Sequence, residues 1–307
     1  MARCSGSCLF TSLALLLLLA VMGPASTAVA EDRPRVIATF SILGDFVSEV
    51  AGDAVDLHVL TPPGAEVHEY ELRPRDFMAL ERADLVFANG YDLEQWMPQL
   101  EATVQPGTRI VSLAETISAE TLPIITGDLE GAPDPHLWMD PALAALYVDA
   151  IAEALADRLP GQADTLRANA DAYIENLEAL RCEMMAELEA VPEDQRVLIT
   201  SEAAFLYFAR AFDFRHDGIW GTNSESEGTP SQIMRILDVI AERQPAAVFW
   251  ESTISSRYVE GVAEDSGVKV AGPLYVDSVG GAGSGVETYL RMMRQNAVTI
   301  RSALADD

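Results

Sequence analysis

Four side chains of the kinds that bind metal ions stand at distant points of the 307-residue sequence. They are His68, His136, Glu202 and Asp277. Each lies at the carboxyl end of a predicted β-strand or in the loop that follows it. Because ligands of open α/β sheets bind beyond the carboxyl ends of the strands, we expect these four side chains to meet in one site.

Two imidazoles and two carboxylates without a thiolate form a borderline-to-hard donor set. Such a set suits Mn²⁺, Fe²⁺ or Zn²⁺ better than Cu⁺. If one or both carboxylates bind through both oxygens, the coordination number rises above four, which favours Mn²⁺ over tetrahedral Zn²⁺. The residue types therefore predict a site for one divalent transition-metal ion and leave the identity of that ion open.

Each of these residues, taken singly, also has a structural explanation. A histidine in a loop is often a surface or capping residue, and Glu202 or Asp277 could cap the segment that follows it. Two other histidines serve as comparisons: His58 alternates with apolar residues inside a predicted strand, and His216 is interpreted as structural. Cys182 falls in the middle of a predicted helix, where a buried thiol in the core is expected.

A metallohydrolase is the main alternative from another class of protein. Catalytic zinc keeps one position open for water, usually beside three protein ligands. The sequence from His68 reads HEYEL and lacks the second histidine of an HExxH motif. Four protein ligands would also leave little room for a substrate. We therefore predict a binding protein rather than an enzyme, with a surface adhesin as a third possibility.

The elements that must position the four side chains alternate between short apolar runs and helical patterns, which is typical of α/β proteins with parallel sheets. The expected strands are Val36–Phe40, Leu57–Thr61, Leu85–Asn89, Arg109–Leu113, Val197–Ser201, Arg215–Trp220, Ala246–Trp250 and Val268–Pro273. The expected fold has two lobes, each with a four-stranded parallel sheet flanked by helices. Residues 31–159 form the N-terminal lobe and residues 195–307 the C-terminal lobe.

Residues 160–194 separate the predicted lobes. This segment has almost no helix breaker inside it and keeps apolar residues at helical spacing. One long, rigid linker helix is expected here. A stiff connector of this kind argues against a large hinge motion between the lobes.

The first thirty residues resemble a secretion signal. Arg3 precedes an apolar run from Leu9 to Met22, which is shorter than the ~20 residues of a membrane-spanning helix. The run leads to Ala28-Val29-Ala30, so cleavage after Ala30 is expected. Cys4 and Cys8 stand before or at the start of the apolar run, where they cannot form a lipobox. The expected location is the periplasm.

The formal net charge of −28 at pH 7 bears on the choice of partner. Nucleic acids and anionic membrane surfaces are polyanions, so a strongly acidic chain is a poor match for either. Cations are the natural partners of such a chain, although an acidic surface can also serve solubility alone.

Several segments resemble motifs of a known family, the metal-binding proteins called cluster A-I, which serve manganese and zinc ABC importers. These segments are VHEYELRPRD, NGYDLEQWM, DPHLWMDP, TSEAAFLYFARAF and EGTPSQI, at residues 67–76, 89–97, 134–141, 200–212 and 227–233. The resemblance covers nearly the whole chain after the signal peptide. It implies two lobes joined by a rigid helix, with one metal ion at their interface.

The resemblance also implies a partner and a ligand set. The partner would be the transmembrane permease of an ABC importer, and such receptors are usually monomers. In the manganese branch the ligands resemble two His, one Glu and one Asp, which match His68, His136, Glu202 and Asp277. Zinc members generally have a histidine in place of Glu202, and many carry a His-rich loop where this chain has ETISAETLPIITGDLEGAP. Mn²⁺ is therefore the expected ion, one per chain, with Zn²⁺ or Fe²⁺ as alternatives.

Overall fold

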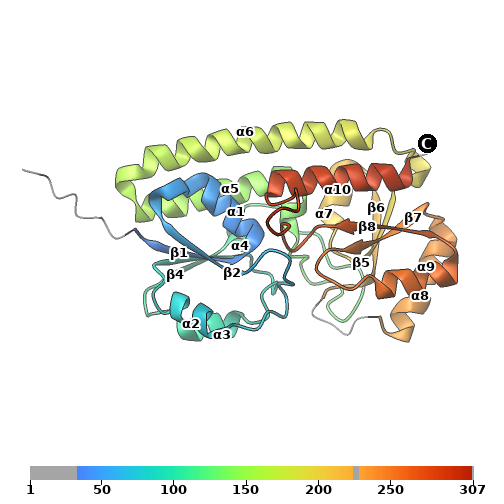
Figure 1. Cartoon of the computed structure of the whole chain (residues 1–307), viewed down its shortest axis with the longest axis horizontal. Coiled ribbons are helices and arrows are strands. Elements are labelled where there is room, and N and C mark those ends of the chain that lie inside the picture. The colour runs from blue at the N-terminus through green and yellow to red at the C-terminus, as the bar shows by residue number, and fades with distance from the viewer. Residues whose placement is uncertain (1–32, 224–227, 306–307) are drawn as a thin grey trace, which may run out of the picture. The chain divides into compact units, whose positions relative to one another are not determined.

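A four-stranded parallel sheet forms the first half of the described chain (Figure 1). The computed structural model describes residues 33–223 and 228–305, so the predicted signal peptide lies outside it. The strand order is β2-β1-β3-β4. The strands are β1 (Arg35–Phe40), β2 (Asp56–Thr61), β3 (Leu85–Ala88) and β4 (Arg109–Ser112).

The sequence of the central strands explains why this sheet forms. Every residue of β3 is buried, as is every residue of β1 after the first. Strands that are covered on both faces read as continuous apolar runs, which is typical of parallel sheets between helices. The intervening helices are α1 (Ser41–Ala51), α2 (Pro74–Leu80), α3 (Met97–Thr103) and α4 (Leu113–Thr116).

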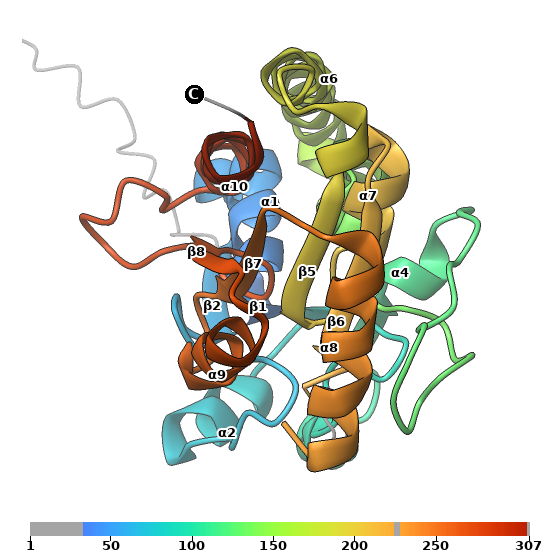
Figure 2. The same ribbon diagram turned by 90° about the vertical axis from the view of Figure 1, so that its right-hand side faces the viewer.

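The second half also consists of parallel strands, but they pair differently from our prediction. Instead of one four-stranded sheet, β5 (Val197–Glu202) pairs with β6 (Arg215–Trp220), and β7 (Ala247–Glu251) pairs with β8 (Lys269–Leu274). Strands β5 and β7 lie side by side (Figure 2). At their carboxyl ends the amide of Glu202 donates to the side-chain carboxylate of Glu251, at 3.3 and 3.4 Å from its two oxygens. The Glu251 carboxylate thus accepts the Glu202 N–H, which in a continuous sheet would be accepted by a backbone oxygen of the neighbouring strand.

Four helices flank the strands of the second half. They are α7 (Leu206–Phe212), α8 (Pro230–Arg243), α9 (Arg257–Ser266) and α10 (Tyr289–Leu304). Helix α8 begins with Pro230 at its first helical position, where a missing backbone N–H costs no helical hydrogen bond. Its N-terminus is closed by a capping box in which Thr229 and Gln232 satisfy each other's backbone amides.

Two long helices connect the two halves. Helix α5 (Pro141–Arg158) is followed by a short 3-10 turn and then by α6 (Ala163–Leu188), which is 26 residues long and packs against α1, α5 and α10 (Figure 1). The long helix is confirmed, although it ends before the predicted limit of residue 194. The residues from Arg33 onward form one compact unit by their contacts. The lobe boundaries stay a prediction.

Helix α6 also corrects the prediction for its cysteine. Cys182 is exposed, not buried in the core. The helix buries a single stripe that includes Leu177, Leu180 and Met184, and Cys182 lies outside this stripe. Because α6 buries only one face, the residue type of Cys182 did not predict whether its side chain is buried.

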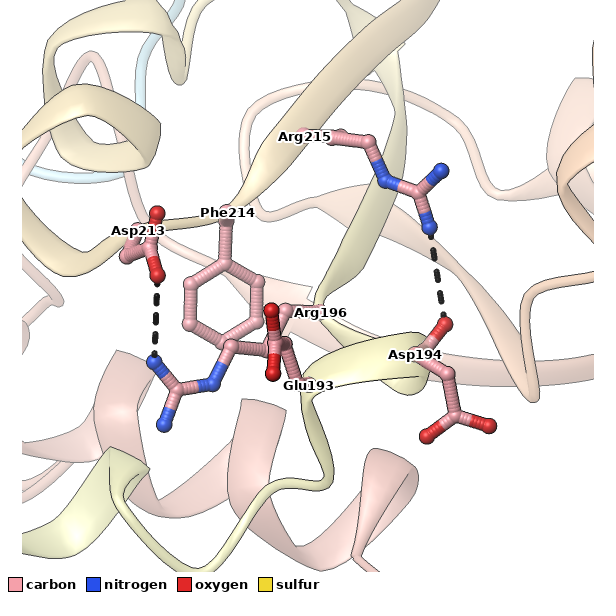
Figure 3. Close-up of a pocket in the computed structure, with 6 residues that line it drawn as sticks. All are labelled: Glu193, Asp194, Arg196, Asp213, Phe214 and Arg215. Carbon is pink, nitrogen blue, oxygen red and sulfur yellow. Dashed lines mark hydrogen bonds and ion pairs between the residues drawn. The ribbon is translucent and has the colours of Figure 1, made fainter.

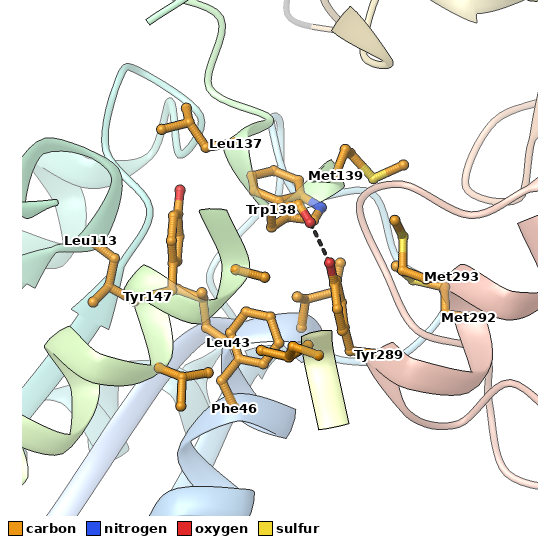
Figure 4. Close-up of a cluster of buried hydrophobic side chains, with 14 of the residues drawn as sticks. Leu43, Phe46, Leu113, Leu137, Trp138, Met139, Tyr147, Tyr289, Met292 and Met293 are labelled. Carbon is orange, nitrogen blue, oxygen red and sulfur yellow. Dashed lines mark hydrogen bonds between the residues drawn. The ribbon is translucent and has the colours of Figure 1, made fainter. Parts of the chain in front are cut away.

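The apolar core extends across the elements that carry the candidate site (Figure 4). Phe46 of α1 packs edge-on against Tyr289 of α10, with ring centroids 4.9 Å apart. The Tyr289 hydroxyl donates to the backbone oxygen of Trp138 at 2.6 Å. The buried loop around residue 138 is thereby held between the first helix and the last. None of the helices in the described part of the chain has the length and apolar composition needed to cross a membrane.

Candidate metal centre

The four predicted site residues lie at the carboxyl ends of strands, as expected. His68 belongs to the loop between β2 and α2, and His136 directly precedes the 3-10 turn Leu137–Met139. Glu202 is the last residue of β5, and Asp277 follows β8. All four side chains are buried, with exposed fractions of 1% or less.

The structure brings these four side chains together. Each offers one donor atom, and the four donor atoms lie within 4.8 Å of one another. His136 Nε2 is 3.7 Å from Glu202 Oε2 and 3.7 Å from Asp277 Oδ1. His68 Nε2 is 3.4 Å from Glu202 Oε1. These separations suit donors arranged around one central ion.

One atom on each of the four side chains has no hydrogen-bond partner among the described residues. These atoms are His68 Nε2, His136 Nε2, Glu202 Oε2 and Asp277 Oδ1. Buried polar atoms are nearly always satisfied, because leaving one unpaired costs about 1–3 kcal/mol. Four such atoms in one place indicate a ligand that satisfies them together, and the donor types suit a divalent transition metal.

The other ring nitrogen of each histidine faces an oxygen. His136 Nδ1 lies 2.6 Å from Asp134 Oδ1, which also accepts from the His136 backbone amide at 3.0 Å. His68 Nδ1 lies 3.5 Å from the hydroxyl oxygen of Thr222. An acceptor at Nδ1 holds the proton there and leaves the lone pair of Nε2 directed into the site. Our sequence reasoning missed the role of Asp134, although this residue begins the DPHLWMDP segment.

The electrostatics of the site favour a bound cation. Burial, together with the carboxylates of Asp277 and Glu251, holds the pKa of Glu202 well above its usual value. Burial also raises the pKa of Asp277. Burial and the neighbouring His136 hold the pKa of His68 well below its usual value, so this imidazole is neutral and able to bind a metal. Crowded buried carboxyl groups retain protons in the absence of a cation, and a divalent ion can replace those protons.

Asn223 contacts both carboxylates of the site. Its backbone amide donates to Glu202 Oε1 at 2.8 Å, and its side-chain amide donates to Asp277 Oδ2 at 3.3 Å. Nothing in the sequence pointed to Asn223, because its position depends on how the chain turns after β6. Glu251, which accepts from the Glu202 amide, was also missed, although it is the last residue of β7 and the rule for carboxyl ends of parallel strands could have pointed to it.

The NGYDLEQWM segment supports the backbone of both histidine loops. The side-chain amide of Asn89 donates to the Pro135 oxygen at 3.0 Å, next to His136. The Trp96 indole donates to the Val67 oxygen at 2.8 Å, and the Gln95 amide donates to the His68 oxygen at 3.2 Å. A segment that carries none of the four donors thus fixes the backbone beside two of them.

The remaining histidines lie outside the site. His216 uses both ring nitrogens: Nε2 accepts from the Phe205 amide at 3.1 Å, and Nδ1 donates to the Leu198 oxygen at 3.0 Å. These bonds bear out its structural interpretation. His58 is in β2, with its Nε2 3.6 Å from the buried carboxylate of Asp76. It contacts none of the four donors through any described interaction.

A surface cavity of about 590 Å³ lies apart from the four donors. Arg196 lies 3.8 Å from Asp213, and Arg215 donates to the Asp194 backbone oxygen at 3.5 Å (Figure 3). The two arginines that line the cavity therefore interact with oxygens of other residues that line it. None of the four metal donors lines this cavity.

Parallel strands that bring two imidazoles and two carboxylates into one buried cluster define a class of protein, the metal-binding α/β proteins. The family model for the periplasmic component A of the zinc-uptake complex (ZnuA) matches residues 36–303. This chain therefore belongs to the ZnuA family, which confirms the resemblance found in its sequence motifs.

Relatives within the family are named for different metals. The chain is 38% identical to the manganese-binding lipoprotein MntA of Halalkalibacterium halodurans over 96% of this chain and 97% of that protein. It is 36% identical to the iron-binding protein YfeA of Yersinia pestis, over 90% of each. The solved structure of the periplasmic zinc-binding protein TroA from Treponema pallidum superposes with a TM-score of 0.83 at 31% identity, covering 89% of this chain and all of that one.

These relatives bear on two further predictions. They are binding proteins of importers rather than enzymes, in agreement with the prediction of a binding protein. The manganese-binding relative is named a lipoprotein, which differs from our expectation of no lipobox. The residues that decide this point in the present chain lie in the segment 1–32, outside the described residues.

Proposed function

We propose that this chain captures one divalent transition-metal ion, Mn²⁺ in the first place, and delivers it to the permease of an ABC importer. The observation that carries the proposal is the convergence of four unpartnered buried donor atoms. His68, His136, Glu202 and Asp277 would be the ligands. The absence of a thiolate from this group and the 38% identity to a manganese-binding protein support Mn²⁺.

Zinc is the second candidate, and a specific observation favours it. Asn223 donates to one oxygen of each carboxylate, and the other oxygen of each, Glu202 Oε2 or Asp277 Oδ1, has no hydrogen-bond partner among the described residues and is the better placed to bind a metal. Four single-atom donors suit tetrahedral Zn²⁺. Fe²⁺ prefers similar donors to Mn²⁺, and an iron-binding relative is 36% identical to this chain.

The proposed site of action is outside the cytoplasm. Its basis is the signal-like segment that ends at Ala30 and the periplasmic description of the family. The protein would act there as a monomer that presents its loaded form to the permease. Helix α6, which packs against α1, α5 and α10, would limit the change on metal binding to small shifts and loop ordering.

Titration calorimetry of chelator-treated protein tests metal capture. We expect one Mn²⁺ or Zn²⁺ per chain. His68→Ala should weaken binding by at least about 100-fold, because it removes one of the four metal ligands. His58→Ala is the matched control, since His58 lies in β2 away from the donors. A folded protein that binds neither ion, or equal effects of the two substitutions, would refute the proposal.

Affinity alone does not identify the ion that is transported. Zn²⁺ binds more tightly than Mn²⁺ to many sites regardless of the physiological cargo. Delivery is therefore tested by measuring cellular manganese, zinc and iron in a strain that lacks this chain. Loss of manganese uptake supports delivery of Mn²⁺, and unchanged uptake of all three metals contradicts delivery.

A further inference from the structure

Asn223 stands where it can control how the two carboxylates bind a metal. It is 4% exposed and follows the end of β6. Its backbone N–H donates to Glu202 Oε1, and its side-chain N–H donates to Asp277 Oδ2. The other two oxygens, Glu202 Oε2 and Asp277 Oδ1, are the ones that lack a hydrogen-bond partner among the described residues.

Trp220 fixes the orientation of the Asn223 side chain. Its indole N–H lies 2.8 Å from Asn223 Oδ1. An indole nitrogen can only donate, so the amide oxygen must face Trp220 and the amide nitrogen must face Asp277. Trp220 is fully buried and packs edge-on against Tyr258, with ring centroids 5.4 Å apart. The donor that faces Asp277 is therefore held by a rigid aromatic residue.

The number of available oxygens matters because the candidate ions differ in coordination. Zn²⁺ is satisfied by four donors in a tetrahedron, whereas Mn²⁺ accepts more oxygen donors, up to an octahedral set. A second oxygen from Asp277 would be Oδ2, and the hydrogen bond from the Asn223 side chain restrains this oxygen and draws electron density from it, so it is the weaker donor to a metal. Glu202 is restrained separately, by a backbone N–H that no substitution at position 223 except proline removes.

We propose that Asn223 determines metal specificity by limiting Asp277 to one oxygen donor. The side chain thereby keeps the site near four single-atom donors and tolerant of Zn²⁺. This inference rests on the proposed function, because it concerns how the same centre binds its ion. It assigns to Asn223 a positioning role that acts through Asp277 rather than a role as a ligand.

The variant Asn223→Leu removes the donor and keeps the side chain at the same number of heavy atoms, so no water can replace the amide. With Asp277 released, the ratio of the Zn²⁺ affinity to the Mn²⁺ affinity should fall by about tenfold, the size of one charge-assisted hydrogen bond. Asn169→Leu is the matched control, since Asn169 is in α6 and donates to the Val50 oxygen instead.

Visible absorption of bound Co²⁺ provides a readout of coordination number that does not depend on affinity. Four-coordinate Co²⁺ absorbs strongly, and Co²⁺ with five or six donors absorbs weakly. We expect the native protein and Asn169→Leu to give the stronger bands, and Asn223→Leu to give the weaker ones. Identical spectra together with an unchanged affinity ratio would overturn the inference.

A second variant is needed because Asn223→Leu leaves the buried Trp220 indole without a hydrogen-bond acceptor and could therefore misfold. Asn223→Asp keeps that acceptor and the side-chain shape, and in the metal-loaded protein, where the cation favours the ionised form, its carboxylate cannot donate to Asp277. It should shift the spectrum and the affinity ratio in the same direction, and if it leaves both unchanged the inference is wrong. Failure of the native protein to bind any of the three ions would instead refute the proposed function.

Discussion

At the scale of single residues, protons compete with a metal ion for the donor atoms of the centre. Burial lowers the pKa of His136, but the carboxylates of Asp134, Asp277 and Glu66 together raise it further, so the net direction is upward. Burial and neighbouring carboxylates raise the pKa of Glu202, and burial raises that of Asp277. In the metal-free protein these groups therefore hold protons at higher pH than isolated side chains do. A divalent ion must displace these protons when it binds.

This proton competition predicts how affinity depends on pH. Lower pH keeps protons on His136, Glu202 and Asp277, so affinity should fall as pH falls. His68, whose pKa is lowered, adds little to the effect. Each displaced proton contributes about tenfold per pH unit, so at least about a 100-fold loss is expected between pH 7.5 and 5.5.

Calorimetry over that pH range measures the effect, with circular dichroism to establish that the fold is intact at each pH. A constant affinity from pH 7.5 to 5.5 in a folded protein would contradict ligation by these groups.

At the scale of elements, the site depends on loops that are tied to one another. The Trp138 indole donates to the Val276 oxygen at 2.9 Å, which joins the loop of His136 to the residue before Asp277. Trp96 makes the corresponding bond to Val67, the residue before His68. Two buried indoles thus fix the backbone beside three of the four donors.

The contribution of this bracing is tested by Trp96→Phe. The phenyl ring retains most of the apolar contact with Tyr70, whose ring lies 5.9 Å from that of Trp96, but it cannot donate to Val67. We expect about tenfold weaker metal binding, because the His68 loop loses one buried hydrogen bond. The measurement is calorimetry of both proteins.

The same substitution at Trp250, in β7 of the other half, is the control and should leave affinity nearly unchanged. If Trp96→Phe binds as tightly as the native protein, the bracing role of the indole is wrong.

The elements also show how far sequence reasoning could reach. All eight predicted strands form within one or two residues of their expected ends, since each is a short apolar run between turns. The convergence of His68, His136, Glu202 and Asp277 followed from the rule for carboxyl ends of parallel strands. These features depend on local patterns, which a sequence displays directly.

Other features depend on contacts that no local pattern displays. The second sheet divides into two pairs, with a side-chain contact from Glu251 between β5 and β7. Asn223 reaches two carboxylates only because the turn after β6 carries it back toward β5. The exposure of Cys182 depends on which stripe of α6 faces its neighbours. Each case requires the tertiary arrangement, and the amino-acid types alone were insufficient.

At the scale of the whole molecule, negative charge is spread over the chain, and acidic groups also gather around the metal centre. The chain carries a formal charge of −28, which raises the local concentration of cations around it. Close to the centre, burial and Asp277 raise the pKa of Glu66 to about 7, and burial raises that of Glu251 to about 8. A bound divalent ion offsets the repulsion among these buried groups, so the folded state is expected to be more stable with metal than without it.

If the metal centre is as described, two imidazoles and two carboxylates from four separate segments of the chain bind one ion. Anomalous X-ray diffraction from crystals grown with Mn²⁺, collected on both sides of the manganese absorption edge, tests it most directly. We expect a single buried peak per chain, about 2.0–2.3 Å from Nε2 of His68 and His136 and from a carboxylate oxygen of Glu202 and Asp277. A peak held by other side chains, or no peak between these four, would contradict it.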